Sequence, residues 1–293
     1  MIRSPRDQEP APARRVPYAA ADREPDTAPR WDAARHTLHA EWTKIRTAAG
    51  PFWLLAATVA LTVSASAVTV AAATCPSGTA CPIDAARLSL TGVQLGQAVV
   101  AMLAVLAICT EYSTGMIRTT LTATPRRSTV LAAKAVIVTA LVLAAATMAV
   151  LGSFLAGRLI LPGHRFTEAR GYSLLSLGDG AVLRAFAGSV LYLALIALFS
   201  LGIAAIIRDS AVAIGTVLGL LYTAPILAST LASDPVWQRR IERYAPMNAG
   251  LSIQTTVGVH SLPITPWGGL GVLAAWATAA LMGGGLAFRL RDA

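Results

Sequence analysis

Six long apolar stretches alternate with shorter polar segments along most of the chain. About 20 apolar residues cross a bilayer core as a helix, so each stretch predicts a membrane-spanning helix. Only Arg208, Asp209 and Ser210 separate the fourth stretch from the fifth. The two together are too long to cross once, so we expect a hairpin rather than one bent helix. The predicted spans cover residues 52–73, 93–110, 135–156, 182–207, 211–232 and 267–288.

The middles of these six spans contain no Asp, Glu, Lys or Arg. Intramembrane carboxylates and bases are the groups that relay protons or couple ions in membrane proteins. Spans without such groups have no evident proton relay or ion-coupling site. Any work done across the membrane must therefore be powered from elsewhere.

Apolar residues recur every three or four positions just before the first span. On a helix they form one narrow stripe, with Arg35 and Arg46 on one edge and Glu41 on the other. We expect this helix to lie flat in the inner headgroup layer with its charges in water, until Gly50 and Pro51 turn the chain into the membrane. The alternative is a cytosolic helix that packs on the protein itself. The stripe comprises Trp31, Leu38, Trp42 and Ile45, with Ala34 and Ala49.

A second amphipathic pattern follows the second span. Tyr112, Met116 and Ile117 share one helical face, while Glu111 and Arg118 lie away from it. A Pro-Arg-Arg sequence ends the pattern, which predicts a short helix on the cytoplasmic side. Two roles remain open for it: fitting a groove in a soluble partner, or linking two spans along the interface.

The loop between the fifth and sixth spans carries a third pattern. Trp237, Ile241 and Tyr244 fall on one stripe, with the neighbouring arginines turned away. We expect a pair of short helices that dip into the outer leaflet, the second of them over the weakly amphipathic residues 251–259. Either they cap a central pathway, or they form a solvated surface helix followed by ordinary loop.

Composition agrees with a membrane protein. Hydrophobic residues make up 55% of the 293 residues and charged residues 13%, and the mean hydropathy is +0.60. These values exclude a soluble globular domain and predict an all-α polytopic membrane protein. Residues 1–32 differ, because they are rich in proline and charge and contain no apolar run. We expect a disordered cytoplasmic tail there, followed by a six-span domain over residues 33–293.

The distribution of basic residues predicts the orientation. Most of the 24 Lys and Arg residues lie in the tail and in the segments that share its side of the membrane. The positive-inside rule then places both termini in the cytoplasm and the chain in the cell membrane. The net charge of +9 favours contact with anionic lipid. Basic residues are not clustered with aromatic residues on one domain, so no nucleic-acid partner is expected.

Three cysteines are too few for a disulfide scaffold. Cys75 and Cys81 fall in the first outer loop, where oxidising conditions would permit a disulfide. Their proximity in sequence is equally consistent with coincidence. Cys109, at the inner end of the second span, is expected to be a small buried hydrophobe.

The motifs of enzymatic sites are missing. Neither Lys44 nor Lys134 follows a glycine, so the chain has no phosphate-binding loop of the Gly-Lys-Ser/Thr kind. No histidine or carboxylate pair has metal-ligand spacing, and no Gly-x-Ser-x-Gly sequence occurs. We therefore expect no catalytic, metal or cofactor site in this chain.

Three segments resemble the ABC-2-type permeases, the membrane subunits of ATP-binding-cassette exporters, in the form common in actinobacteria. They are Glu-Trp-Thr-Lys-Ile-Arg at 41–46, Glu-Tyr-Ser-Thr-Gly-Met-Ile-Arg at 111–118 and Tyr-Ala-Pro-Met-Asn-Ala-Gly at 244–250. The resemblance implies a permease that forms a homodimer or heterodimer and works with a separate ATPase, which binds ATP and magnesium. It also implies a coupling helix that contacts this ATPase: Glu111, Tyr112, Ser113, Thr114, Gly115, Met116, Ile117 and Arg118.

The sequence contains few features that indicate the substrate. A path without charges suits an apolar or amphipathic cargo moved outward. Polar residues available to line it are Gln94, Gln97, Thr216, Tyr222 and Thr223. Most such side chains in membrane helices bond to their own backbone or to a neighbouring helix. The alternative function is a non-transporting sensor or assembly protein that recruits a soluble partner.

Overall fold

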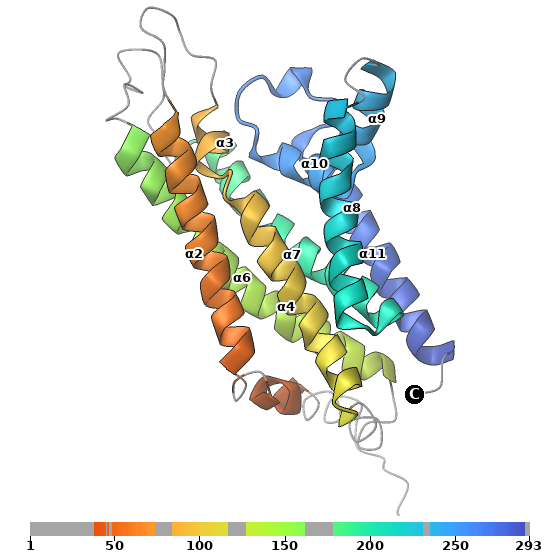
Figure 1. The fold of residues 1–293 in the computed structure, drawn as a ribbon. Coiled ribbons are helices and arrows are strands. Elements are labelled where there is room, and N and C mark those ends of the chain that lie inside the picture. Colours follow the sequence, from red (N-terminus) through yellow and green to blue (C-terminus); the bar gives the residue numbers. More distant parts are fainter. Residues whose placement is uncertain are drawn as a thin grey trace, which may run out of the picture.

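The computed structural model describes residues 38–44, 46, 49–73, 84–116, 127–161, 178–230 and 235–290. Over these ranges the chain is helical and contains no strand. Six of the described helices are long and apolar enough to cross a membrane, so the chain is a multi-pass membrane protein, as predicted. They are α2 (Ala49–Ala72), α4 (Val93–Ser113), α6 (Arg127–Ile160), α7 (Gly180–Ile207), α8 (Ser210–Thr230) and α11 (Pro266–Leu290) (Figure 1).

Some predicted features fall outside the described residues. The tail over residues 1–32 and the pair Cys75 and Cys81 are among them, as are Trp31, Ile45, Ile117 and Arg118. These predictions remain untested.

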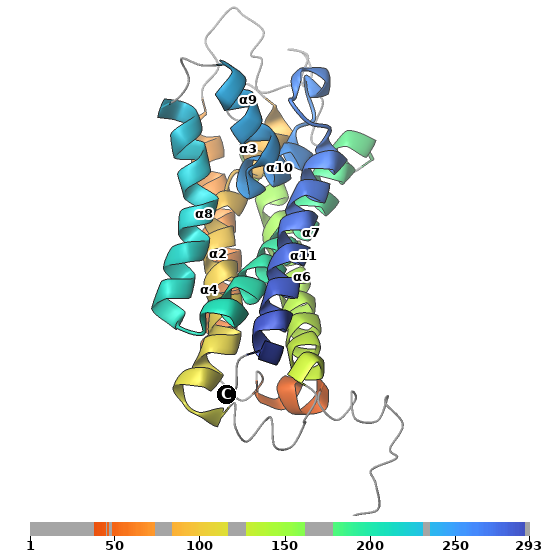
Figure 2. The same ribbon diagram turned by 90° about the vertical axis from the view of Figure 1, so that its right-hand side faces the viewer.

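Helix α7 occupies the centre of the bundle. It packs against α11, α4, α6 and α8, while α2 lies at one side against α4 and α6 (Figures 1 and 2). The sequence of α7 is apolar nearly all round, which is the pattern of a helix buried among others. Tyr192, Leu193, Ile196, Phe199 and Leu201 of α7 are all buried in the core.

A glycine permits the closest contact of α7 with α11. A methyl group built on Gly202 would lie 2.4 Å from the carbonyl carbon of Ala280 and 2.6 Å from the nitrogen of Leu281. Both are main-chain atoms of α11, which cannot rotate away. Small residues of this kind let helices in a membrane approach backbone to backbone.

The predicted hairpin between the fourth and fifth spans is confirmed. Helix α7 ends at Ile207, and Arg208 adopts the left-handed conformation with φ of 66°. The Arg208 N–H donates to the Ala204 carbonyl (2.8 Å), which closes the last turn. The Arg208 guanidinium donates to the Ala287 carbonyl of α11 (3.1 Å), so the turn is fixed to the sixth span.

Short helices gather at the upper end of the bundle in Figure 1. They are α3 (Ala85–Ser89), α9 (Pro235–Tyr244), α10 (Pro246–Leu251), η3 (Ser252–Gln254) and η4 (Val259–Ser261). Asp84 caps α3 by accepting from the Arg87 N–H (3.0 Å) and also accepts from the Thr256 hydroxyl (2.7 Å). The predicted helix with Trp237, Ile241 and Tyr244 is present as α9. The second helix was expected over residues 251–259, whereas α10 and η3 cover residues 246–254, and α10 is buried on its neighbours.

Two helix boundaries differ from the predicted span limits. Helix α4 continues past residue 110 to Ser113, and α6 begins at Arg127 rather than near residue 135. Hydropathy marks the part of a helix that crosses hydrocarbon, whereas the hydrogen-bonded helix can continue beyond it. The longer helices carry Glu111 and Lys134 as helical residues at the lower end of the bundle in Figure 1.

Candidate functional site

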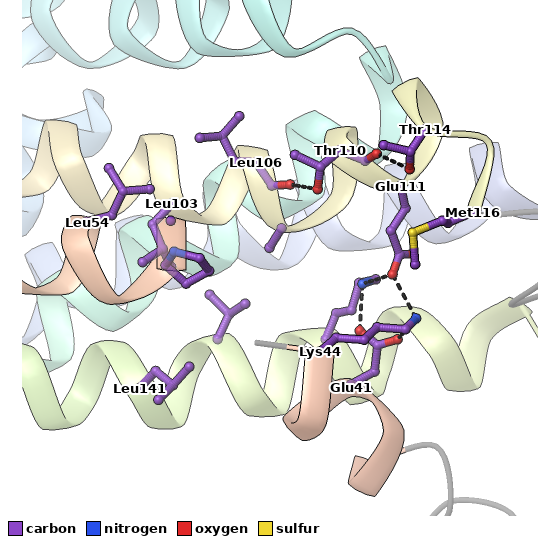
Figure 3. Close-up of a pocket in the computed structure, with 15 residues that line it drawn as sticks. Glu41, Lys44, Leu54, Leu103, Leu106, Thr110, Glu111, Thr114, Met116 and Leu141 are labelled. Atoms are coloured by element: carbon purple, nitrogen blue, oxygen red, sulfur yellow. Dashed lines mark hydrogen bonds and ion pairs between the residues drawn. The ribbon is translucent and has the colours of Figure 1, made fainter. Parts of the chain in front are cut away.

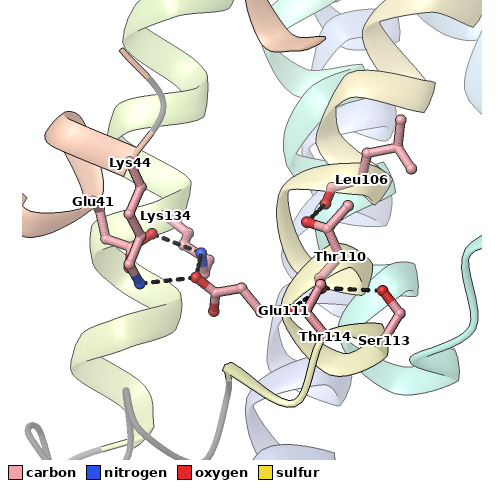
Figure 4. A network of polar contacts seen from close by, with 8 residues as sticks. All are labelled: Glu41, Lys44, Leu106, Thr110, Glu111, Ser113, Thr114 and Lys134. Atoms are coloured by element: carbon pink, nitrogen blue, oxygen red, sulfur yellow. Dashed lines mark hydrogen bonds and ion pairs between the residues drawn. The ribbon is translucent and has the colours of Figure 1, made fainter. Parts of the chain in front are cut away.

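Four charged side chains meet at the lower end of the bundle, and we call them the charged cluster: Glu41, Lys44, Glu111 and Lys134. The Lys134 Nζ donates to Glu41 Oε2 (2.6 Å) and to Glu111 Oε1 (2.9 Å). The Lys44 Nζ donates to Glu41 Oε1 (2.7 Å) and to Glu111 Oε1 (3.0 Å). Each ammonium group thus bridges the same two carboxylates (Figure 4). In their ordinary charge states the four groups sum to zero.

Three separate segments supply the charged cluster. Glu41 and Lys44 lie three residues apart on a helical segment over residues 38–44, so they share one face. Glu111 projects from the last turns of α4 and Lys134 from the start of α6. The cluster therefore ties the segment before α2 to the ends of two spans.

The charged cluster is largely removed from solvent. Glu41 is 2% exposed and Glu111 and Lys134 are each 6% exposed, while the Lys44 side chain is 33% exposed. A buried ion pair adds little net stability, because desolvation offsets the attraction. Removing one member leaves an uncompensated buried charge, which costs about 3–5 kcal/mol. The cluster thus fixes how its three segments are arranged.

The pKa values of the two cluster residues before α2 move in opposite directions. Burial opposes ionisation of Glu41, but the Lys134 and Lys44 ammonium groups outweigh it and lower the pKa of Glu41 below its usual 4.5. Burial also disfavours the charged form of Lys44. Its hydrogen bonds to Glu41 and Glu111 outweigh that effect and raise the pKa of Lys44 above its usual 10.5.

A cavity of about 400 Å³ adjoins the charged cluster. Its wall is mainly aliphatic, with side chains from α2, α4 and α6, and Figure 3 shows the cluster at one end of it. Glu111 lines this cavity, and its second oxygen, Oε2, is buried without a hydrogen-bond partner. An unsatisfied buried acceptor costs about 1–3 kcal/mol, and more when it is charged. The aliphatic part of the wall includes Leu54, Leu103, Leu106, Val138 and Leu141.

The short helix predicted to begin at Glu111 does not begin there. Glu111, Tyr112 and Ser113 are the last residues of α4. Thr114 and Gly115 then form a turn, in which Gly115 has φ of +71°. The prediction placed a boundary at Glu111 because apolarity stops there, although the backbone hydrogen bonds of the helix continue.

Individual residues of this segment also differ from the prediction. Glu111, expected on a polar face, is buried in the charged cluster, whereas Met116 is 45% exposed. The guanidinium carbon of Arg208 lies 5.0 Å from the centre of the Tyr112 ring, so this part of the segment packs on the α7–α8 turn. Contact with an ATPase is untested by these observations.

The helix before α2 is only partly as predicted. Trp42 is 46% exposed and Leu38 is half-buried, which leaves part of the apolar stripe uncovered. Glu41, expected in water, is instead buried against Lys134. This edge of the helix packs on the protein, as in the alternative interpretation, because two ammonium groups there compensate the carboxylate.

The predicted path residues do not share one surface. Gln97 is fully buried, where its side-chain oxygen accepts from the Tyr192 hydroxyl and its amide donates to Met247 Sδ (3.3 Å). The Tyr222 hydroxyl donates to the Gln94 main-chain carbonyl. The Thr216 hydroxyl donates to the carbonyl of Val212 in its own helix (2.7 Å). Of the five, only Gln94 and Thr223 are exposed along their helices.

Lys134 is the member that sequence reasoning missed as part of a site. In the sequence it stood out only as a lysine that does not follow a glycine, and its partner Glu41 was expected on one edge of an interfacial helix. A usable signal was present, since an acid at 111 and a base at 134 flank the same connection at the ends of two spans. The expectation of a buried Cys109 is confirmed, because this residue is 1% exposed.

The comparisons with known proteins do not assign this chain to a family. No protein-family model and no curated protein matches the chain. Among the described residues, no group of three or more histidine, cysteine or acidic side chains could hold a metal ion. The described residues define a multi-pass membrane protein with six candidate spans, a charged cluster whose net charge is zero, and an aliphatic cavity at one end of the bundle.

Proposed function

We propose that this chain is the membrane-spanning permease subunit of an ABC-2-type exporter, which moves an apolar or amphipathic substrate outward. The observation that carries the proposal is the charged cluster, which joins α4, α6 and the helix before α2 at the base of the connection from α4 to α6. The middles of the spans hold no ionisable group, so the energy comes from a separate ATPase that binds ATP and magnesium.

The charged cluster provides a way to transmit motion. A soluble ATPase that pushes on the connection after Met116 displaces the end of α4. Separating Glu111 from Lys134 would leave buried charges unpaired, so α6 and the helix before α2 move together with α4. Because α4 and α6 both pack on the central α7, the displacement reaches the core of the bundle.

The proposed orientation places the charged cluster and both termini in the cytoplasm. In this arrangement the exposed Trp42 rests in the inner headgroup layer of the cell membrane. Helix α9 then lies at the outer leaflet, where Trp237 and Tyr244 are exposed. The guanidinium groups of Arg240 and Arg243 lie 5.5 and 5.6 Å from these two rings, an arrangement suited to a membrane surface.

We further propose that two such permease chains pair through α8. Gly215 and Gly219 lie four residues apart on its exposed face, and a methyl group built on either would meet nothing within 4 Å. This small-xxx-small spacing lets helices of two chains approach closely in a membrane. The partner is a second copy of this chain or a related permease. Thr223 lies on the same exposed face and is a candidate for contact with substrate.

Co-purification from the native membrane tests the function directly. The expected result is a cassette ATPase that stays with the permease through mild detergent extraction. A kinase or a regulator in its place would contradict the exporter and support the sensor.

A charge substitution tests the coupling step. Met116→Arg is expected to reduce ATP-dependent transport at least tenfold at equal membrane yield, because it places a charge at the proposed ATPase contact. His39→Arg adds the same charge on an exposed residue of the helix before α2 and is the matched control. Equal transport by the two variants would count against coupling at Met116.

A further inference from the structure

The aliphatic cavity beside the charged cluster has the size of a ligand site. Its volume of about 400 Å³ lies within the range of small-molecule pockets, which is about 300–1,000 Å³. Three helices and the segment before α2 supply its wall, so it is a property of the tertiary fold. It lies inside one chain, among α2, α4 and α6, and not on the exposed face of α8.

One polar atom in this wall has no partner among the described residues. Glu111 Oε1 accepts from both Lys44 and Lys134, whereas Glu111 Oε2 is buried and accepts from no group in the described part of the chain. The threonine hydroxyls nearby do not supply the missing donor, since Thr110 donates to the Leu106 carbonyl (2.6 Å) and Thr114 to the Thr110 carbonyl (2.7 Å). Within the described residues Oε2 therefore has no donor, and a molecule in the cavity can supply one.

Charge balance defines what kind of donor this is. The two carboxylates and two ammonium groups of the cluster already cancel. A cation or an anion in the cavity would be an unpaired charge beside aliphatic walls, which is strongly unfavourable. An uncharged hydroxyl satisfies Oε2 without this penalty. Water is the alternative donor, because Glu111 Oε2 and the hydroxyls of Thr110 and Thr114 are polar partners at this end of the cavity.

We propose that this cavity binds an uncharged amphiphile, whose apolar chain lies against Leu103, Leu106 and Leu141 and whose hydroxyl group donates to Glu111 Oε2. This binding site goes beyond the proposed exporter function, and ligand binding to it is measured without ATP or an ATPase. Failure of either proposal therefore leaves the other standing. Both a membrane diacylglycerol and a free long-chain alcohol have this chemistry.

Photolabelling of the full chain tests the site. The protein is reconstituted in phosphatidylcholine nanodiscs, because this lipid offers no hydroxyl donor. The probe is hexadecanol with a photoreactive diazirine on its chain, and the control probe is its methyl ether. We expect at least fivefold more labelling of α4 and α6 peptides by the alcohol. Equal labelling by the two probes would overturn the proposal and assign the partner of Oε2 to water.

Two tryptophan variants separate the cavity from the lipid-facing surface. Leu106→Trp fills the cavity and is expected to abolish the excess labelling by the alcohol. Leu95→Trp makes the same change on the same helix at a residue that is 53% exposed, and it leaves labelling intact. Labelling that persists in Leu106→Trp, or its absence from the native chain, contradicts the site.

A Glu111→Gln variant removes the preference for the alcohol. Its amide oxygen stays toward the two ammonium groups, so the amide NH₂ replaces Oε2 and turns the acceptor into a donor. The variant is expected to lose the preference for the alcohol over the ether, an outcome that a merely structural role for Glu111 would not give. Competition with unlabelled diacylglycerol or dodecanol distinguishes the two sources of ligand.

Discussion

Lys134 connects two carboxylates through one buried ammonium group. Its bonds to Glu41 and Glu111 cross from α6 to the helix before α2 and to the end of α4. Lys44 makes parallel bonds, but its side chain is 33% exposed and water can replace part of them. The two lysines are therefore unequal members of the charged cluster.

Lys134→Met is expected to destabilise the protein by about 3–5 kcal/mol, because it leaves two buried carboxylates with less compensation. Thermal unfolding in detergent measures the change. Arg158→Met, at an exposed position on the same helix, is the control and should have little effect. Adding Glu111→Gln to Lys134→Met should recover part of the loss, whereas purely additive losses would show that the two residues are not coupled.

The pKa shifts predict a stability plateau between two pH limits. Glu41 stabilises the fold fully above its unfolded pKa of 4.5, and this contribution is lost as the pH falls through its lower folded pKa. Lys44 contributes fully below its unfolded pKa of 10.5, and this contribution is lost as the pH rises through its higher folded pKa. Melting temperature against pH checks both limits. In the Glu41→Gln variant the melting temperature should fall less as the pH becomes acid. An equally steep fall in the variant and the native protein would refute the assignment of this loss to Glu41.

At the scale of elements, main-chain contact positions α7 against α11. A flexible side chain can move away from an added group, but the atoms opposite Gly202 belong to the main chain of α11. They cannot move without displacing the helix. The left-handed Arg208 and its bond to Ala287 hold the same two helices together at a second place. Shape decides the packing at Gly202, because the residues opposite it, Ala280 and Leu281, are apolar and approach with their main chain.

Gly202→Ala is expected to destabilise the bundle by about 1–3 kcal/mol, because the added methyl group forces α7 and α11 apart. Gly271→Ala on α11 is the matched control, since a methyl group there meets nothing within 4 Å. Thermal unfolding of the two variants in the same detergent gives the comparison. Equal melting temperatures would mean that the crossing relaxes without cost.

At the scale of the whole molecule, the orientation in the membrane separates the proposed ATPase side from the exit side. The helical segment over residues 38–44 lies at the charged-cluster end of the bundle and α9 at the opposite end (Figure 1). His39 on the first and Val236 on the second are both exposed. The positive-inside rule assigns the first end to the cytoplasm. The sites of labelling from outside the cell therefore test the direction of export.

Cysteine labelling of intact cells checks this orientation. In a background with Cys75, Cys81 and Cys109 replaced by serine, a membrane-impermeant maleimide should label Val236→Cys. It should label His39→Cys only after permeabilisation. The reverse pattern would invert the topology and remove the coupling role of the segment after α4.

Association of two chains is the second property of the whole molecule. Replacing Gly215 and Gly219 with leucine should weaken dimerisation at least tenfold, which corresponds to about 1.4 kcal/mol, because the bulk prevents close approach of α8 helices. Crosslinking in nanodiscs at several protein-to-lipid ratios measures it. Gly271→Leu, on the exposed surface of α11, is the control. Unchanged dimerisation in the double variant would exclude α8 as the interface.

The sequence by itself determined the six spans and the hairpin at Arg208. Length and apolarity are local properties, and a bilayer requires both of each crossing segment. The short helix α9 was predictable for a similar reason, since helical spacing of apolar residues is visible in one segment. Helix α10 was not, because it begins at Pro246, ahead of the expected residues 251–259. The ends of α4 and α6 were harder to predict from the sequence, because the helix hydrogen bonds continue beyond the apolar residues.

Only the tertiary structure decided which charges meet. Glu41, Glu111 and Lys134 are far apart in sequence and each has an unremarkable local context, so no single segment reveals their contact. The same holds for Gln97, which local pattern placed on a path but packing buries against Tyr192. Burial of a polar group is tolerated only where partners from other helices converge, and that convergence is a property of the packed bundle.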